Sequence, residues 1–569
     1  MDTPVRTELR EKCSCFMGFL TRWKKYVHLA LLTIGLSLFH IYLVFASLRH
    51  LEPVLPLIVI VAIIWLVVLY KLSRRYATSM IPQSVQDQFE QCFMTCWNNK
   101  FLKRILSVAA LAVPATFLVV TVFMSVYNRW QRINSLFGFL VIVFVLLASC
   151  THPSEIRWRP VIWGFSVQVC FGLLTLKWSE GQKGIRWVSD QIITFLSFAD
   201  QGSEFVYGFL AKPPRICGME PVLMFSALQT VLYFSSISSL LYHLGLLQMV
   251  FAGMAKMLQI TLATTAIESF HAVVSIFLGM CESAIIISPY LARQTESELF
   301  AILCSGFASS TVAMFSVYSM FGACPQYLVA SSLMSAPASL ACSKLAVPET
   351  EISATENSNF QLEISRHENL LDAISAGAID ALKIILEMGA NLVVFVALLA
   401  LTNSCIRWLG DRVGILDLSL EKILGYAFFP AAFVVGFSEE TDMNRRVEEN
   451  LLAAELLGTS VVLNELIAFQ LMGKFIAQGK LSARSQMMAS FALCNFSNFG
   501  SIGIQLGTYG AICSEKKSAV SRLALKSILV GCAVALSSAC WAGLLVDTVQ
   551  TCGLHNATES CFKVDVQRL

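Results

Sequence analysis

Charged residues are scarce in this sequence. Only 14% of its 569 residues are Asp, Glu, Lys or Arg, whereas 56% are hydrophobic, and the mean hydropathy is +0.66. Soluble proteins usually carry about 25% charged residues. The composition therefore excludes an ordinary soluble domain and indicates an all-α polytopic membrane protein, because helices satisfy their own backbone hydrogen bonds in lipid. Membrane lipid is then an expected partner.

Several functional signatures are missing. There is no Lys/Arg-rich tract with interleaved aromatic residues, so no nucleic acid is expected as a partner. Neither an HExxH nor a GxSxG motif occurs, and Cys92 and Cys96 have no second pair of metal ligands nearby. We therefore expect neither an enzyme nor a resident cofactor. The 18 cysteines are mostly single within apolar runs, which is typical of small core residues and not of a disulfide framework.

The chain begins with a polar, basic segment, residues 1–26, which the positive-inside rule places in the cytoplasm. Residues 27–150 are expected to form additional N-terminal transmembrane helices. The apolar runs are Val27–Ser47, Pro53–Tyr70, Ile105–Tyr127 and Leu136–Cys150. Val161–Leu176 is another expected span, and the helical spacing of apolar residues in Gly184–Gln201 predicts an interfacial helix.

Residues 160–345 form the first predicted core half. Its apolar run Leu247–Leu291 is interrupted by many polar residues, including Glu268 and Glu282, which predicts a re-entrant hairpin lining a cavity. Ala301–Met320 follows as a span with small polar residues at its centre, and Tyr327–Leu345 closes the half. Residues 346–372 are a polar, acidic loop.

Residues 373–546 repeat this plan. The apolar run Ala373–Thr402 is followed by a mixed segment, Leu416–Phe437, that predicts an interfacial helix and a span. Leu451–Phe475 is then the second expected hairpin, Met487–Tyr509 the second span with central polar residues, and Ser518–Val546 the last span. Two halves with the same hydropathy plan are typical of an inverted-repeat transporter whose site lies between broken helices. We expect separate scaffold and transport domains.

Glu465 lies in the middle of an apolar run, where a carboxylate costs about 2.5–3.5 kcal/mol at membrane depth. Asn498 and Ser501 are three residues apart and share one helix face, and Gly500 and Gly503 permit unwinding and close backbone approach. A carboxylate, a carboxamide and a hydroxyl together suit a hydroxyl-rich solute such as a sugar. The alternative is a helix-packing cluster, because small polar residues also join helices in lipid.

The same stretch carries a family resemblance. LLGTSVVLNELIAFQ and FALCNFSNFGSIGIQLG resemble the signature of the concentrative nucleoside transporters, which in animals are sodium-coupled importers of nucleosides. The similarity extends to ATTAIES (Ala263–Ser269), SPYLA (Ser288–Ala292) and the segment Leu328–Glu351. It covers about Pro160 to Leu545. It implies secondary active transport by alternating access in a homotrimer.

The resemblance also implies roles for individual residues. Glu465, Asn498 and Ser501 match the family's ribose-binding residues, and Phe496 matches its aromatic wall. The base-recognition motif, often Gly/Ser-Gln-Thr-Glu, reads Gly279-Met280-Cys281-Glu282 here. Ser309 and Ser310 lie where relatives vary with base preference. Met280 removes an amide and leaves an apolar surface for a larger ring, which favours purine nucleosides. A gap-filling core methionine is the alternative interpretation.

Sodium ligands in the family are an asparagine, a hydroxyl residue and backbone carbonyls. Here the corresponding residues are Ser275, Ser309, Leu278 and Ser310. Because Ser275 is shorter than asparagine, either water fills the gap, sodium binds weakly, or protons drive transport instead. A transport-incompetent, receptor-like relative that binds nucleosides is a further alternative. His271 is expected to be a hydrogen-bonded structural residue, with a part in proton movement as the alternative.

The C-terminal tail, residues 547–569, is expected to be extracellular, since an odd number of spans follows a cytoplasmic start. Asn556 is then an acceptor for N-glycosylation, and Cys552 and Cys561 are candidates for pairing in an oxidising compartment. The tail and the family together predict a plasma-membrane protein.

Overall fold

The computed structural model describes residues 33–49, 129–214, 221–353, 367–415 and 418–553, with isolated positions between 26 and 127. The chain divides into two units, residues 1–108 and 109–569, which are described separately here. In the first unit an apolar helix, Thr33–Arg49, covers most of the first expected span. Most of the next two expected spans, the glycosylation site Asn556 and Cys561 lie outside the described residues.

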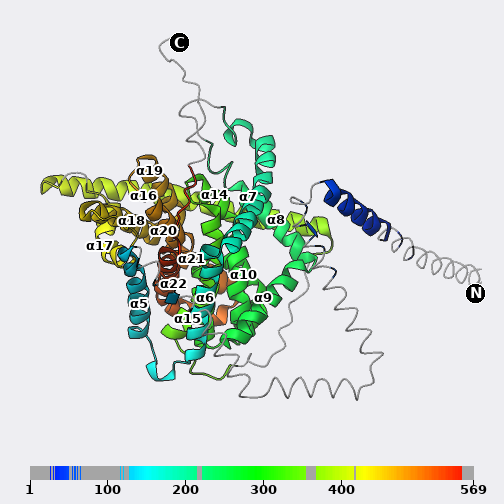
Figure 1. Ribbon diagram of the computed structural model, residues 1–569, viewed down its shortest axis with the longest axis horizontal. Coiled ribbons are helices and arrows are strands. Elements are labelled where there is room, and N and C mark those ends of the chain that lie inside the picture. The colour runs from blue at the N-terminus through cyan, green and yellow to red at the C-terminus, as the bar shows by residue number, and fades with distance from the viewer. Residues whose placement is uncertain are drawn as a thin grey trace, which may run out of the picture. The chain divides into compact units, whose positions relative to one another are not determined.

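In the described part of the second unit, three α-helices come before α8 (Gln229–His243). These are α5 (Ile133–Ala148), α6 (Trp158–Gly172) and α7 (Ser179–Tyr207), and one π-helical turn, Leu173–Lys177, extends α6 (Figure 1). The last two of them, α6 and α7, lie almost entirely within the first predicted core half, residues 160–345. Helix α7 contains the expected interfacial segment but is longer at both ends. Only small or apolar side chains of α7 are buried, among them Leu196 and Ala199, so the helix contacts the bundle along one narrow stripe.

The rest of the first half contains eight helices among the described residues. They are α8 (Gln229–His243), α9 (Leu246–Leu262), α10 (Ala266–Leu278), α11 (Met280–Ile286), α12 (Ser288–Leu291), α13 (Glu296–Phe307), α14 (Met314–Met320) and α15 (Pro325–Ala346). The expected span Ala301–Met320 is broken into α13 and α14, because the backbone of residues 308–313 leaves the helix.

The hairpin in the structure is shorter than the expected segment Leu247–Leu291. The first part of that segment is a separate helix, α9, which ends at Ala263 in the left-handed conformation with φ 57°. A capping box formed by Thr265 and Glu268 then starts α10. The hairpin itself is α10 followed by α11, and it turns at Gly279, whose φ of 92° favours glycine.

The second half has the same order of elements. Its helices are α16 (Leu370–Arg412), α17 (Leu420–Val435), α18 (Met443–Val462), α19 (Glu465–Ala477), α20 (Ala483–Cys494), α21 (Gly500–Ile512) and α22 (Lys517–Leu545). Helices α18 and α19 form the second hairpin, and α20 and α21 are the second broken helix. The mixed segment Leu416–Phe437 contains one helix, α17, and not an interfacial helix plus a span.

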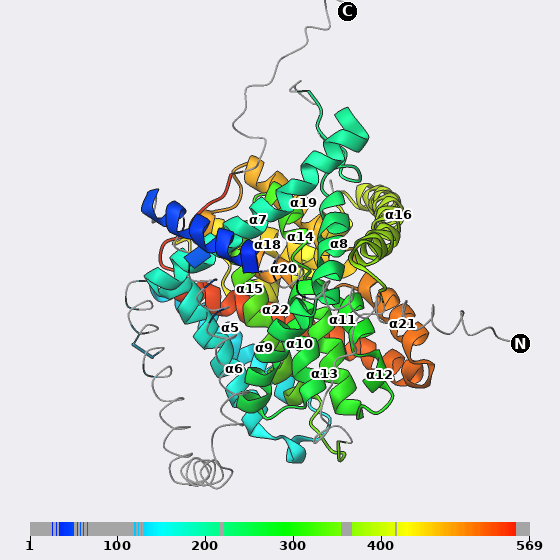
Figure 2. The ribbon, with the colours of Figure 1, turned by 90° about the vertical axis from the view of Figure 1, so that its right-hand side faces the viewer.

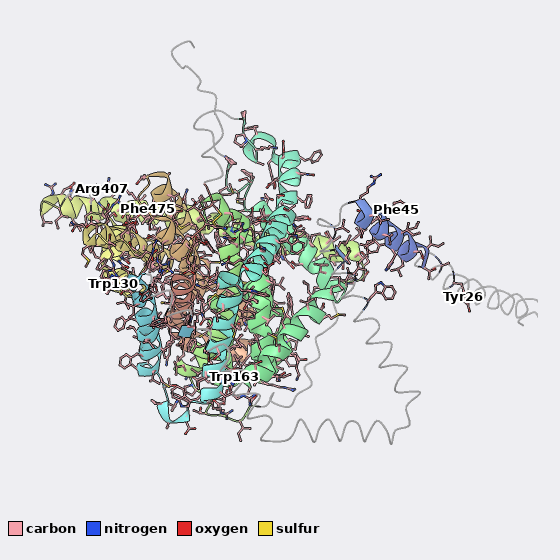
Figure 3. All side chains as sticks on the ribbon, in the orientation of Figure 1. Tyr26, Phe45, Trp130, Trp163, Arg407 and Phe475 are labelled. Carbon is pink, nitrogen blue, oxygen red and sulfur yellow. A yellow bond between two sulfur atoms is a disulfide. The ribbon has the colours of Figure 1, made fainter. Side chains whose placement is uncertain are left out.

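Helices α15 and α22 form the interior of the unit, and nearly every residue of α15 is buried (Figure 2). Helix α16, in contrast, is mostly exposed. It is 43 residues long, and only 6% of its most apolar 18-residue stretch is buried. Gly377 of α16 packs against the backbone of Ser235 and Ser236 in α8, and the far end of the helix, near Arg407, projects from the bundle (Figure 3).

The two hairpins start from opposite ends of the helix bundle. At one end, Glu268 at the start of α10 pairs with Lys344, and Lys526 donates to the carbonyl oxygens of Ser149 and Ala346. At the other end, Arg132 joins Glu439, just before α18, to Asp547, just after α22. Opposite entry of two equivalent hairpins is the arrangement expected of an inverted repeat.

A disulfide joins Cys324, at the N-terminus of α15, to Cys552, after α22. The expected pairing of Cys552 with Cys561 is therefore wrong, because Cys324 already holds Cys552. The partner was hidden in the sequence by a separation of 228 residues. The bond lies at the same end of the bundle as Asp547, since Gln326 and Tyr327 of α15 bond to Gln550 in the same tail.

Among the described residues, four helices are long and apolar enough to cross a membrane, or five if α8 and α9 are counted as one bent span. The pair α8–α9 bends by 83°. The hairpin helices and the broken helices are not among them: most are short, and α18, although 20 residues long, carries several charged residues. Interrupted helices of this kind are expected where irregular backbone lies inside the protein.

Candidate functional site

The second hairpin turns at Leu463 and Asn464 and places Glu465 at the first position of α19. The Asn464 side chain caps this helix, since its Oδ1 accepts the backbone N–H of Ile467 at 2.9 Å. A carboxylate at a helix N-terminus interacts favourably with the helix dipole. The local sequence Asn-Glu thus places a carboxyl group at the hairpin tip.

Asn498 connects Glu465 to Ser501. The Asn498 Nδ2 group donates to Glu465 Oε2 at 2.8 Å. Its Oδ1 accepts from the backbone N–H of Ser501 at 2.8 Å and from Ser501 Oγ at 3.0 Å. Asn498 lies in the break before α21 and not inside a helix, so it meets Ser501 by folding back over the first turn of α21. The three expected residues do lie together.

Sequence reasoning missed Tyr318. Its hydroxyl donates to Glu465 Oε1 at 3.4 Å, and Ser310 Oγ donates to the Tyr318 hydroxyl at 3.3 Å. The tyrosine ring stacks on Phe469 with ring centroids 4.3 Å apart. The signal was present, because a tyrosine in an apolar helix needs a partner for its hydroxyl. Phe496 is 4% exposed and lies in the apolar cluster that also holds Tyr318 and Phe469.

The glycines beside Asn498 differ from expectation. A Cβ at Gly500 would lie 3.2 Å from Asn498 Oδ1, so glycine helps the asparagine fold back. Gly503 has nothing within 4 Å of its Cβ position, so no other backbone approaches it closely. The close approach occurs at Gly531 in α22, where a Cβ would lie 2.1 Å from Ser497 Oγ.

The first hairpin directs its motif toward α21. Met280 Sδ lies 3.9 Å from Gln505 Nε2, and Cys281 Sγ lies 3.6 Å from Thr508 Oγ1. Ser501, Gln505 and Thr508 are spaced by four and three residues, so they follow one face of α21. That face therefore reaches from the Glu465 cluster to the first hairpin.

Gly279 and Glu282 lie close together at the tip of the first hairpin. A Cβ on Gly279 would be 3.4 Å from Glu282 Oε2 and 3.5 Å from Thr311 Cβ. His271 of the same hairpin is fully buried, with Nδ1 at 2.7 Å from Ser305 Oγ and Nε2 at 3.1 Å from Ser283 Oγ. This histidine is hydrogen-bonded within the protein, as expected.

The expected cation residues come from two adjoining segments. The Phe277 carbonyl oxygen accepts from Thr311 Oγ1 and from the backbone N–H of Val312, both at 3.3 Å, which joins the hairpin tip to the break after α13. Leu278 is the last residue of α10, and Ser309 and Ser310 lie in that break.

The hydroxyl groups of these cation residues have partners in the protein. Ser275 Oγ donates to the carbonyl oxygens of Ala272 at 3.2 Å and Ser305 at 3.4 Å. Ser309 Oγ donates to Gly306 at 2.9 Å. Ser310 Oγ donates to the Tyr318 hydroxyl, which in turn donates to Glu465, so Ser310 is connected to Glu465 through Tyr318.

The two breaks also touch each other. Ser497 Oγ, in the second break, donates to the carbonyl oxygen of Phe307, the last residue of α13, at 3.0 Å. Polar groups of both halves thus converge where helices are interrupted, with a carboxylate, two amides and several hydroxyls on buried surfaces.

Three family profiles together match most of residues 137–543. "Na+ dependent nucleoside transporter N-terminus" matches residues 137–210, "Nucleoside recognition" matches 224–324, and "Na+ dependent nucleoside transporter C-terminus" matches 327–543. The rat protein "Sodium/nucleoside cotransporter 1" is 33% identical over 508 residues, which are 87% of this chain and 75% of that protein. The chain belongs to the sodium-dependent nucleoside transporter family.

Other family members agree. The human "Sodium/nucleoside cotransporter 1" is 32% identical and covers 92% of this chain and 79% of its own length. The solved structure "Structure of CNTnw in an inward-facing substrate-bound state" is 32% identical, with a TM-score of 0.68, and covers 73% of this chain and 98% of that one. The chain is accordingly an all-α, multi-pass membrane transporter and not an enzyme.

Proposed function

We propose that this chain imports nucleosides by sodium-coupled secondary active transport with alternating access. The observation that carries the proposal is the buried chain of hydrogen bonds from Tyr318 through Glu465 and Asn498 to Ser501. It offers a charge-assisted acceptor beside hydroxyl and amide groups, which suits the hydroxyls of a ribose. The relatives named as sodium/nucleoside cotransporters support the same substrate and ion.

In this proposal Glu465, Asn498 and Ser501 bind the ribose, with Phe496 as an aromatic wall. The base lies toward the first hairpin, against Gly279-Met280-Cys281-Glu282 and Ser309-Ser310. Because α21 spans both regions along one face, a single nucleoside reaches from one to the other. The thioether of Met280 gives an adaptable apolar surface, and we propose a preference for purine nucleosides.

Sodium is proposed to bind where the first hairpin adjoins the break after α13. The expected ligands are the side chains of Ser275 and Ser309 and the carbonyl oxygens of Leu278 and Ser310, which are the hard oxygen donors that such cations prefer. The Ser275 hydroxyl is bonded to backbone oxygens, so sodium has to compete with the protein for it. This competition favours proton coupling as the alternative.

The disulfide supports a proposal for the membrane orientation, and the exposed surface of α16 supports one for assembly. A disulfide persists in an oxidising compartment, so we propose that the end with Cys324 and Cys552 is extracellular, with a cytoplasmic N-terminus, a glycosylated Asn556 and residence in the plasma membrane. The exposed apolar surface of α16 is unfavourable in water and is expected to contact lipid or another protein. We propose that lipid and two further copies in a homotrimer cover this surface.

The test is uptake of radiolabelled adenosine and uridine by transporter-deficient cells, in sodium and in choline medium, at neutral and acid pH. Sodium-dependent, saturable adenosine uptake is expected. Uptake that needs acid pH and ignores sodium would replace sodium with protons. Binding of nucleoside to purified protein without uptake would instead identify a receptor-like protein, and the absence of both would overturn the proposal.

A further inference from the structure

Gln505 has a buried carboxamide that the protein itself does not satisfy. The side chain is 2% exposed. Its Nε2 group has a weak sulfur acceptor, Met280 Sδ, at 3.9 Å, and its Oε1 has no hydrogen-bond partner among the described residues. A buried polar atom without a partner costs about 1–3 kcal/mol. A side chain that only packs α21 against the first hairpin has no need of this amide.

The surroundings make room for the amide. A Cβ at Gly306, in α13, would lie 2.6 Å from Gln505 Nε2, so any larger residue there displaces the carboxamide. Gln505 is one turn beyond Ser501, which bonds to Asn498, and one turn before Thr508, which bonds to Cys281. The amide therefore lies between the proposed ribose site and the tip of the first hairpin.

We propose that the Gln505 carboxamide hydrogen-bonds the nucleobase and is a specificity-determining residue of the transporter. This inference rests on the proposed function. A carboxamide offers one acceptor and two donors. It pairs in a bidentate manner with the N6 amino group and N7 of adenine. The adjacent Met280 provides an apolar surface for the ring, so the preferred substrates are 6-aminopurine nucleosides.

The test compares adenosine with two analogues that each lack one half of this edge. In 7-deazaadenosine a C–H replaces N7, and in purine riboside the 6-amino group is missing. Wild-type protein is expected to take up adenosine with a kcat/KM about tenfold above either analogue, since a buried group loses a partner in each case. The variant Gln505→Met, of similar length but without an amide, is expected to bring the three values within about twofold of one another.

Two further variants separate recognition from folding. Gly306→Ala keeps the amide but displaces it, and it should also lower the preference for adenosine. Tyr509→Phe removes a neighbouring buried hydroxyl that likewise has no partner among the described residues, and it should leave the preference unchanged. The measured quantity is the ratio of kcat/KM for adenosine to kcat/KM for each analogue. Partial loss of protein from the cell surface lowers both values equally and leaves the ratio unchanged.

The outcomes distinguish this inference from the proposed function. A Gln505→Met variant that transports and still prefers adenosine over both analogues overturns the assignment of Gln505. Equal uptake of all three nucleosides by the wild type has the same consequence and leaves nucleoside transport intact. If Gln505→Met transports nothing, binding of 7-deazaadenosine to the purified variant is measured, and complete loss of that binding also overturns the assignment. A wild type that neither binds nor transports any nucleoside overturns both proposals.

Discussion

The two hairpins have the same architecture but satisfy their polar groups differently. At the second, the Glu465 carboxylate accepts hydrogen bonds from Asn498 and Tyr318. At the first, Met280 and Cys281 make only sulfur contacts with α21, at 3.9 and 3.6 Å. A site that is complete before the substrate arrives suits a constant group such as ribose. One with weak internal contacts suits the part of the substrate that varies.

The anchors of the hairpins differ as well. The first begins with Glu268, 1% exposed, which pairs with the buried Lys344. The second is preceded by Glu439, which has three arginine partners and is 14% exposed. Removing one partner from a buried pair leaves an uncompensated charge, whereas a shared, more exposed cluster retains other partners. The first hairpin is therefore expected to be the more fragile of the two.

The largest effect is expected when the first anchor is broken. Lys344→Met should lower the free energy of unfolding by about 3–5 kcal/mol, because Glu268 is left buried without its cation. Thermal unfolding of the purified protein measures this. The control is Arg522→Gln, which removes an exposed pair with Glu296 and should cost less than about 1 kcal/mol. Equal losses in the two variants would contradict the comparison.

A change at the second hairpin should affect transport more than folding. If Glu465 binds the ribose as proposed, Glu465→Gln removes the carboxylate that would strengthen those hydrogen bonds, so kcat/KM for adenosine should fall by about 100-fold. Uptake normalised to surface protein provides the measurement, with Glu296→Gln as the control. Normal uptake by Glu465→Gln would show that this carboxylate does not bind the substrate.

The contact between the breaks can be strained directly. In Gly531→Ala the new Cβ meets Ser497 Oγ at 2.1 Å and Phe307 Cβ at 3.3 Å, and such overpacking costs about 1–3 kcal/mol. Lower thermal stability and reduced uptake are both expected. Gly503→Ala, with open space around its Cβ position, is the matched control. If both variants behave alike, this close approach does not matter.

A smaller effect is expected for Tyr318→Phe. The variant keeps the stacking on Phe469 but loses one hydrogen bond of 3.4 Å to Glu465. Since Asn498 still holds the carboxylate, KM for adenosine should rise by about three- to tenfold with little change in kcat. A loss as large as that of Glu465→Gln would mean that Tyr318 contacts the substrate directly.

The smallest effect is a pH dependence at the second anchor. Burial alone would raise the pKa of Glu439, but Arg484, Arg132 and Arg129 outweigh it and hold the pKa below its ordinary value. This stabilisation is present above the ordinary carboxyl pKa and is lost as the pH falls through the lowered pKa. The melting temperature should therefore decline in acid, and Glu439→Gln should reduce the decline. An unchanged acid response in the variant would exclude Glu439 as its source.

The sequence predicted the fold because interrupted apolar runs with Glu268, Glu282 and Glu465 are unusual in a membrane protein. It also grouped Glu465, Asn498 and Ser501 correctly, but it placed Asn498 and Ser501 on one helix face, whereas Asn498 lies in the break before α21. It missed Gln505, whose amide is less conspicuous than a charge, and Tyr318, whose partner lies 147 residues away. Contacts of this range depend on how the halves pack, and the spacing of residues in the sequence does not contain that information.

The bond between Ser497 and Phe307 makes the two broken helices dependent on each other. Phe307 ends α13, so the break frees its carbonyl oxygen from the helical ladder, and a hydroxyl from the opposite half takes the place of the missing donor. If the second helix were continuous, the first would retain an orphaned carbonyl in the protein interior. Neither half can therefore be exchanged for an uninterrupted helix pair without a compensating change in the other.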